Sequence, residues 1–220
     1  MTCPIYLTIF IQHFLPTITV RDSSRTNLTT KCDEVLDKLF DWTTSNRLTI
    51  NYDKTFYLII TNQSNTDHSD YSFALNGHIL DMKRQGKFLG IILDDKLKFN
   101  HHIDYICNKI SKSIGIIYRL KDVLPRHCLF SLYYSFIYPY LTYCNLIWGG
   151  TYDTHLNPLN ILQKKAIRII NNQPYLAHTE PLFNSSNLLT LHDIHKYFLA
   201  IYMYKHRNSQ LYFRSHHHNT

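Results

Sequence analysis

The pattern of hydrophobic and polar positions changes its period once along the chain, near residue 100. Before this point, residues 28–42 repeat apolar side chains at spacings of three and four, which predicts one amphipathic helix. Apolar runs at residues 56–60 and 87–93 predict strands, and the Asn76-Gly77 pair between two apolar segments predicts a tight hairpin turn. The first part of the chain should therefore form a small antiparallel sheet with one helix.

Beyond residue 100 the apolar positions follow a helical period. A stripe over residues 103–117 predicts one long helix, and residues 159–169 predict another. Pro125 suits the first turn of a helix between them, which Pro139 should kink or end. The chain is thus expected to be an α+β protein in which the sheet is followed by a mostly α-helical bundle.

Two pairs of residues have the spacing of helix caps. Thr190 with Asp193 should begin the last of four helices in the second part, and Thr30 with Asp33 resembles a capping box for the helix in the first part. Residues 1–22 show neither period, so they could form a strand or a helix, or they could be unrelated to the fold.

Charge divides the chain where the hydrophobic period does. Residues 1–97 contain 10 Lys and Arg against 11 Asp and Glu, whereas residues 98–220 contain 13 against 5. The basic second part indicates a polyanionic partner such as nucleic acid. A basic solvated surface without any partner would have the same composition.

Composition argues against several other classes of protein. The five cysteines include no Cys-x-x-Cys pair, which disfavours a disulfide framework and a zinc ribbon, and six glycines disfavour a glycine-rich nucleotide loop. Residues 128–152 contain no Asp, Glu, Lys or Arg, but their tyrosines and Pro139 favour a buried helix over a membrane span. A membrane or interaction protein built on residues 128–152 stays an alternative. The terminal His216-His217-His218 is interpreted as a tail rather than a metal site.

The Asp94-Asp95 pair follows an apolar run and suggests chemistry at a strand end. Adjacent carboxylates can hold the cations of two-metal phosphoryl transfer, but a third carboxylate, Asp53 or Asp81, would have to join them. The alternative is a strand-ending turn with solvated acids. We favour the turn, so we assign no metal ligand.

Basic residues supply the candidate nucleic-acid contacts. Lys54, which follows Asn51 at the entry to a strand, could donate a proton or contact a phosphate, or it could be a plain surface lysine. Cations on one helical face can neutralise phosphates without reading bases, although such a face is also a common solvated surface. The helical candidates are Lys164, Lys165 and Arg168, with Lys112 and Arg119 as an extension.

Several short motifs follow one another in a fixed order. They are Asp41-Trp42, residues 46–55, 87–94, 97–103 and 138–144, Trp148-Gly149 and residues 162–170. In this order they resemble the distal palm, and the region after it, of non-LTR retrotransposon reverse transcriptases of the jockey-like kind. The resemblance covers about residues 24–215. It divides the chain into an unmatched segment (1–23), a distal palm (24–97), a helical thumb or connection region (98–210) and a tail (211–220).

The resemblance implies roles for several of these residues. Asn51 and Lys54 match the motif whose lysine is proposed to assist pyrophosphate departure, and Lys87 lies in the element that holds the primer end. The helices after residue 98 correspond to the thumb-like region that grips an RNA/DNA template–primer duplex. The parent chemistry is RNA-directed DNA synthesis, a nucleotidyl transfer that uses Mg²⁺.

The chain departs from the family at the catalytic hairpin. A Tyr/Phe-x-Asp-Asp hairpin should lie before the Asp-Trp helix, where this sequence has only Asp22. The fingers and proximal palm, which would be partners of this region, are also unmatched. We therefore expect a reverse-transcriptase fragment that is inactive alone, has no cofactor of its own, retains a template–primer surface, and resides in the nucleus or cytoplasm. A non-enzymatic nucleic-acid-binding protein and a degraded copy without function stay alternatives.

Overall fold

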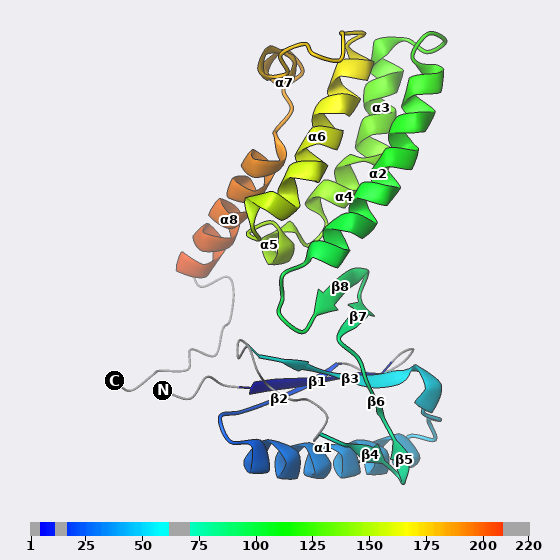
Figure 1. The fold of residues 1–220 in the computed structure, drawn as a ribbon, viewed down its shortest axis with the longest axis vertical. Helices are drawn as coiled ribbons and strands as arrows, with labels where there is room; N and C mark the ends of the chain where they lie inside the picture. The colour runs from blue at the N-terminus through cyan, green and yellow to red at the C-terminus, as the bar shows by residue number, and fades with distance from the viewer. Residues whose placement is uncertain (1–4, 12–16, 62–70, 209–220) are drawn as a thin grey trace. The chain divides into compact units, whose positions relative to one another are not determined.

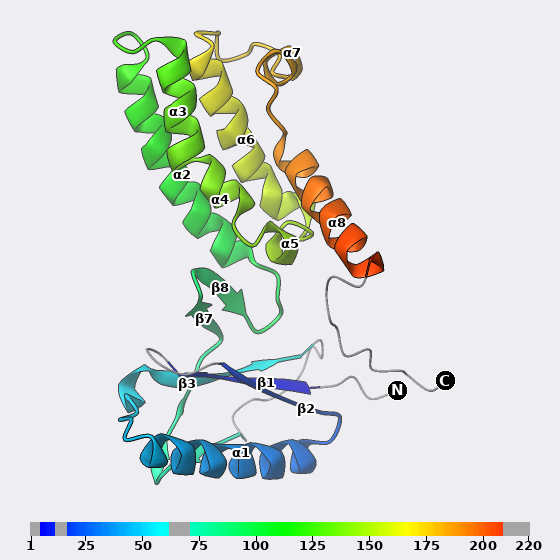
Figure 2. The same ribbon diagram turned by 180° about the vertical axis from the view of Figure 1, so that it is seen from behind.

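The computed structural model describes residues 5–11, 17–61 and 71–208, and contacts between residues divide the chain into two compact units. The boundary follows Phe99, and each unit has its own hydrophobic residues inside it. The first unit combines strands with one long helix, whereas the second is helical throughout its described part (Figures 1 and 2). The protein is therefore an α+β chain, which confirms the prediction from the hydrophobic period.

The first unit contains all the strands of the described chain. Its elements are β1 (Ile5–Ile11), β2 (Ile18–Asp22), α1 (Arg25–Ser45), the 3₁₀ turn η1 (Tyr52–Lys54), β3 (Thr55–Ile60), β4 (Ala74–Leu75), β5 (His78–Ile79), β6 (Asp81–Met82), β7 (Gln85–Phe88) and β8 (Ile91–Asp94). The main sheet has the order β2-β1-β3-β6, with β1 antiparallel to both of its neighbours and β6 parallel to β3. The segment from residue 1 to residue 22, which the sequence left open, thus supplies two strands of this sheet.

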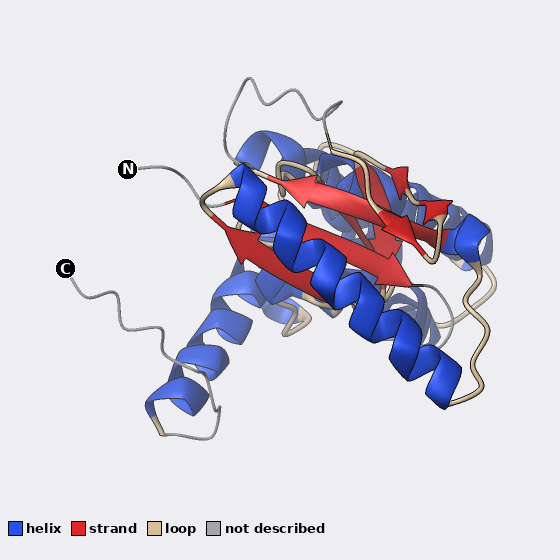
Figure 3. Ribbon diagram, turned by 90° about the horizontal axis from the view of Figure 1, so that it is seen from below, coloured by secondary structure: helices blue, strands red, loops and turns tan. Residues whose placement is uncertain are grey.

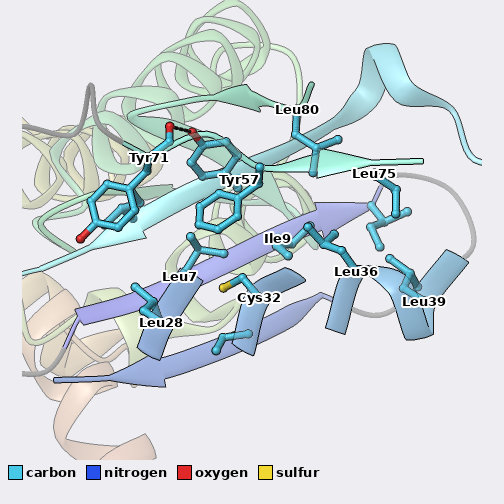
Figure 4. Packing of buried hydrophobic residues seen from close by; sticks show 14 of the residues in the cluster. Leu7, Ile9, Leu28, Cys32, Leu36, Leu39, Tyr57, Tyr71, Leu75 and Leu80 are labelled. Carbon is cyan, nitrogen blue, oxygen red and sulfur yellow. Dashed lines mark hydrogen bonds between the residues drawn. The ribbon is translucent and has the colours of Figure 1, made fainter. Parts of the chain in front are cut away.

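One face of the sheet packs on α1, which lies along it in Figure 3. Leu7 and Ile9 of β1 point to this face, and Leu28, Cys32 and Leu36 of α1 complete the core shown in Figure 4. The spacing of the three helix residues by four is the one that places side chains on a single helical stripe. The helix expected over residues 28–42 is therefore confirmed, and its apolar stripe is the reason it docks on the sheet.

The opposite face of β1 is also buried. Phe10 stacks on Phe56 of β3 with ring centroids 4.9 Å apart, and Phe88 and Leu93 of the β7–β8 hairpin pack against this pair. Burial on both faces explains why β1 is an almost continuous apolar run instead of an alternating one. It also explains why its pattern gave no clear strand period.

A hairpin turn, a helix start and a strand differ in how closely they follow the sequence pattern. Asn76 and Gly77 join β4 to β5 with φ of 50° and 77°, the left-handed values of the predicted hairpin turn. The capping box at Thr30 and Asp33 is wrong, because α1 begins five residues earlier, at Arg25, and both residues lie inside it. The single strand expected over residues 87–93 is in fact the antiparallel pair β7 and β8.

The second unit is a bundle built around α2 and α6, which pack against each other. Its elements are α2 (Asn100–Leu120), α3 (Arg126–Phe136), α4 (Tyr138–Thr142), α5 (Asn145–Trp148), α6 (Asp153–Ile170), α7 (Glu180–Ser185) and α8 (Leu191–Arg207). The predicted role of Pro125 is confirmed because α3 begins directly after it, and the break before α4 occurs next to Pro139. Thr190 accepts a hydrogen bond from the Asp193 backbone N–H, which confirms this cap of α8.

A buried glutamine joins three helices of this unit. Gln163 of α6 is 1% exposed, and its Nε2 donates to the hydroxyl of Tyr133 on α3 and to the carbonyl of Leu189. The backbone N–H of Leu191, the first residue of α8, donates to Gln163 Oε1. Because a buried amide is costly unless its donors and acceptor are used, this residue fixes where α3 and α8 meet α6.

A second polar contact fixes α8 near the short helix α5. The buried Asn145 donates through Nδ2 to the Leu141 carbonyl, so its Oδ1 accepts from Nδ1 of His195, 3.0 Å away. A Cβ on Gly149 would lie 2.6 Å from that histidine nitrogen. The Trp148-Gly149 pair, which carried part of the family resemblance, therefore has a packing reason: Trp148 is completely buried and Gly149 leaves room for His195.

Candidate nucleic-acid interface

Lys54 is held at one end of the main sheet. The side chain of Asn51 accepts a hydrogen bond from the Lys54 backbone N–H, and Thr55 Oγ1 donates to the Asn51 carbonyl, so both bonds shape the turn that enters β3. Thr55 is paired in register with Ile11, the last residue of β1. The exposed Lys54 thus belongs to the same end of the sheet at which β1 leads into the connection to β2.

The β1–β2 hairpin lies directly before α1, where the family resemblance places the catalytic hairpin. Its described strands carry one carboxylate, Asp22, which accepts a 2.8 Å hydrogen bond from the Ser24 backbone N–H and a 2.6 Å bond from Lys31. The hydrogen bond from Lys31 is the main cause of a lowered pKa of Asp22. This carboxylate therefore attaches the start of α1 to the sheet. The connecting residues 12–16, which lie outside the described part, read Gln-His-Phe-Leu-Pro and include no carboxylate.

The β7–β8 hairpin, which packs on the face of the sheet that is turned away from α1, carries Lys87. A Cβ on Gly86 would lie 2.4 Å from the Phe56 ring, so the glycine lets the hairpin backbone sit directly on that ring. Alternation along the strand turns Lys87 away from the buried Gly86, and Lys87 is exposed. The turn consists of Leu89 and Gly90 with φ of 45° and 86°, and Leu89 is 72% exposed. The hairpin is thus anchored at its base and exposed at its tip.

Asp94 belongs to the strand-ending turn that the sequence favoured, but it is buried instead of solvated, because backbone N–H groups satisfy its carboxylate. Its Oδ1 accepts from the backbone N–H groups of Lys96 and Lys98 at 3.1 and 3.0 Å, and its Oδ2 accepts from Phe99 at 2.7 Å. A carboxylate that accepts several backbone N–H bonds organises a tight turn and is itself strongly held. Over the ranges that the structure describes, no group of three His, Cys, Asp or Glu side chains is placed to hold a metal ion.

The five candidate cations of the helical unit do not share one environment. Lys112 and Arg119 are exposed on α2, and Lys164 and Lys165 are exposed on α6; none of these four forms an ion pair with a described residue. Arg168 differs, because its Nε donates to the Ala177 carbonyl at 2.8 Å. Its guanidinium also lies 6.0 Å from the centre of the Tyr175 ring. Arg168 therefore holds the loop after α6 through Nε while it keeps its positive charge.

Two further observations bear on the alternatives. No helix in the described ranges is both long and apolar enough to cross a membrane. The uncharged stretch 128–152 is divided among α3, α4 and α5, and it contributes the buried Tyr133 and Trp148 to the bundle.

Gln163 was not identified from the sequence as a residue that organises the bundle. Its position on the buried stripe between Leu159 and Ala166 was a signal for this role.

No protein-family model matches the chain, and no solved structure matches it significantly. Among curated proteins, the RNA-directed DNA polymerase from mobile element jockey of Drosophila melanogaster is 29% identical over 157 residues, which is 70% of this chain and 17% of that protein. The probable RNA-directed DNA polymerase from transposon BS of the same species is 29% identical over 122 residues, which is 54% of this chain and 14% of that protein. The RNA-directed DNA polymerase from mobile element jockey of Drosophila funebris is 26% identical over 152 residues, which is 68% of this chain and 16% of that protein.

These relatives are all RNA-directed DNA polymerases, that is, reverse transcriptases. More particularly, the chain is related to the RNA-directed DNA polymerases of jockey-like non-LTR retrotransposons, and it corresponds to one part of such a polymerase. The matched segments span only 14 to 17% of these three relatives.

Proposed function

We propose that this chain is the distal palm and thumb-like part of a jockey-like reverse transcriptase, and that its task is to hold a template–primer duplex. The observation that carries the proposal is the set of exposed cations on α2 and α6, which have no ion-pair partner among the described residues of a polymerase-related chain. Lysine and arginine side chains neutralise phosphates independently of base sequence, which suits a polymerase that copies any template.

Lys54 and Lys87 extend the proposal to the first unit. Lys54 lies at the end of the sheet where Ile11 of β1 pairs with Thr55, and Lys87 is carried by a hairpin anchored on Phe56. We assign Lys54 to the phosphates of an incoming nucleotide and Lys87 to the primer end. Both assignments rest on the family resemblance together with the exposure of the two side chains.

Within the described ranges, no group of three His, Cys, Asp or Glu side chains is placed to hold a catalytic Mg²⁺. Two-metal phosphoryl transfer needs cations clamped by carboxylates next to the attacking and leaving oxygens. In the β1–β2 hairpin the only carboxylate is Asp22, which is engaged with Lys31, and Asp94 is bonded to three backbone N–H groups. We therefore propose no bond-forming step for this chain, and we infer that it does not polymerise by itself.

The test combines binding and synthesis on the same substrate. The purified chain should bind an RNA template annealed to a DNA primer, with an affinity that falls steeply as salt rises, and should incorporate no nucleotide with Mg²⁺ present. Absence of salt-dependent binding would refute the proposed function. Nucleotide incorporation that is lost in Asp95→Ala, with an unchanged circular dichroism spectrum, would show that the acidic pair performs chemistry after all.

A further inference from the structure

Gly115 lies in the exposed face of the long helix α2. A glycine inside a helix is destabilising relative to alanine, because it loses more backbone freedom on folding. A Cβ at this position would meet no atom within 4 Å, and the backbone of Gly115 is helical rather than left-handed. Neither packing within the described chain nor backbone conformation therefore requires glycine here.

Cations flank this glycine along the same helical face. Lys112 precedes Gly115 by three residues and Arg119 follows it by four, which are the spacings of neighbours on a helix surface. Both are exposed and neither forms an ion pair with a described residue. They are about 10 Å apart along the helix axis at 1.5 Å per residue. Ser111, also exposed, adds a small side chain one turn before the glycine.

The face carries little negative charge to satisfy these cations internally. Asp104 is the only carboxylate of α2, and it lies eleven residues before Gly115, about 16 Å away along the axis. The result is a gap in the side chains at Gly115, with a cation three residues before it and another four residues after it. The exposed Tyr118 borders the same gap three residues after the glycine. This arrangement fits a flat, negatively charged polymer that comes close to the helix between the two cations.

Building on the proposed function, we propose that the sugar–phosphate backbone of the bound duplex crosses α2 at Gly115, with phosphates held by Lys112 and Arg119. The missing side chain lets the sugar–phosphate chain approach the helix, and the two cations accept its charge on both sides. Because the contact involves no base, the duplex is bound independently of its sequence. Gly115 is a positioning residue in this arrangement, because it makes room without bonding to the nucleic acid.

Gly115→Leu tests the steric part of the proposal. Leucine is a good helix former, and open space surrounds the position, so the variant should fold at least as well as the parent. Its side chain should nevertheless keep the duplex away. We expect at least a tenfold weaker Kd for an RNA–DNA hybrid by fluorescence anisotropy, with an unchanged or higher midpoint of thermal unfolding.

Lys112→Ala with Arg119→Ala tests the electrostatic part. Losing two phosphate contacts should reduce the slope of log K against log salt by about 1.8, because each contact contributes about 0.9 on duplex DNA. The matched control is Lys196→Ala with Lys205→Ala, which removes the same charge from exposed positions of α8. An equal loss of slope in the control would show that net charge, rather than this face, governs binding, and would overturn the inference.

The outcomes separate this inference from the proposed function. If the parent chain binds the hybrid and Gly115→Leu binds it equally well, the assignment of α2 is refuted and the proposed function stands. If the parent chain binds no duplex, both are refuted. If Gly115→Leu weakens heparin binding as much as hybrid binding, the face accepts any polyanion, and the assignment to a duplex backbone is wrong.

Discussion

Gln163→Leu should destabilise the helical unit more than any surface change. The substitution keeps the approximate size of the side chain but removes three hydrogen bonds, of 2.9 to 3.0 Å, to Tyr133, Leu189 and Leu191. At about 1 kcal/mol for each bond, the direct loss is about 3 kcal/mol. The backbone N–H of Leu191 would also lose its acceptor inside the protein, which adds about 1–3 kcal/mol, while the more apolar side chain recovers part of the total.

The measurement is urea unfolding followed by tryptophan fluorescence. Trp148 is completely buried in the helical unit, whereas Trp42 belongs to α1, so a Trp42→Phe background leaves a single reporter of the unit that contains Gln163. We expect the free energy of unfolding to fall by about 3 kcal/mol in this background, with the slope on urea unchanged.

Gln173→Leu is the matched control for this change. Gln173 is exposed and makes only one hydrogen bond, to the Asn171 carbonyl, so its replacement should alter stability by less than about 0.5 kcal/mol. Tyr133→Phe should have an intermediate effect of about 1 kcal/mol, because it removes a single acceptor of Gln163. A loss below 1 kcal/mol in Gln163→Leu would refute the view that this glutamine organises the bundle.

Three further predictions concern the first unit and the thiols. Gly86→Ala should lower stability by about 1–3 kcal/mol in urea unfolding, because its Cβ would overlap the Phe56 ring; an unchanged midpoint would contradict this packing. Asp94→Ala should lose about 3 kcal/mol or more, since three backbone N–H groups lose their acceptor, and full stability would contradict the turn. Burial raises the pKa of Cys32 to about 12 and that of Cys107 to about 11, so at pH 8 iodoacetamide should modify both far more slowly than free cysteine, with rapid reaction only after unfolding. Modification of either thiol in the folded chain at the rate of free cysteine would be inconsistent with its burial.

The described carboxylates and the exposed cations of the helical unit differ in their bonding partners. Asp22 is used to fix α1, and Asp94 is used to shape the turn before α2, so both carboxylates have structural partners. Four exposed cations of α2 and α6 form no ion pair with a described residue, namely Lys112, Arg119, Lys164 and Lys165. The proposed division of labour follows from this contrast: the carboxylates stabilise the fold, and the cations are available for a ligand.

The sequence by itself determined the elements whose cause is local. The helices α1, α2 and α6 follow from apolar side chains at spacings of three and four, and the β4–β5 turn follows from the ability of Asn76 and Gly77 to adopt positive φ. The cap of α8 at Thr190 is equally local, because the bond joins residues three apart. The α+β class and the family relationship also rested on order along the chain.

Only the tertiary structure decided the features that join distant segments. β1 is buried on both faces by α1 and by the β7–β8 hairpin, so its sequence had lost the alternation that marks a half-exposed strand. Gly86 is explained by the Phe56 ring, thirty residues earlier, and the loop after α6 is held by the bond from Arg168 Nε to the Ala177 carbonyl. A hydrophobic period or a charge count depends only on the types of residues and their order. The bonding partners of a residue depend on which segments the folded chain brings into contact.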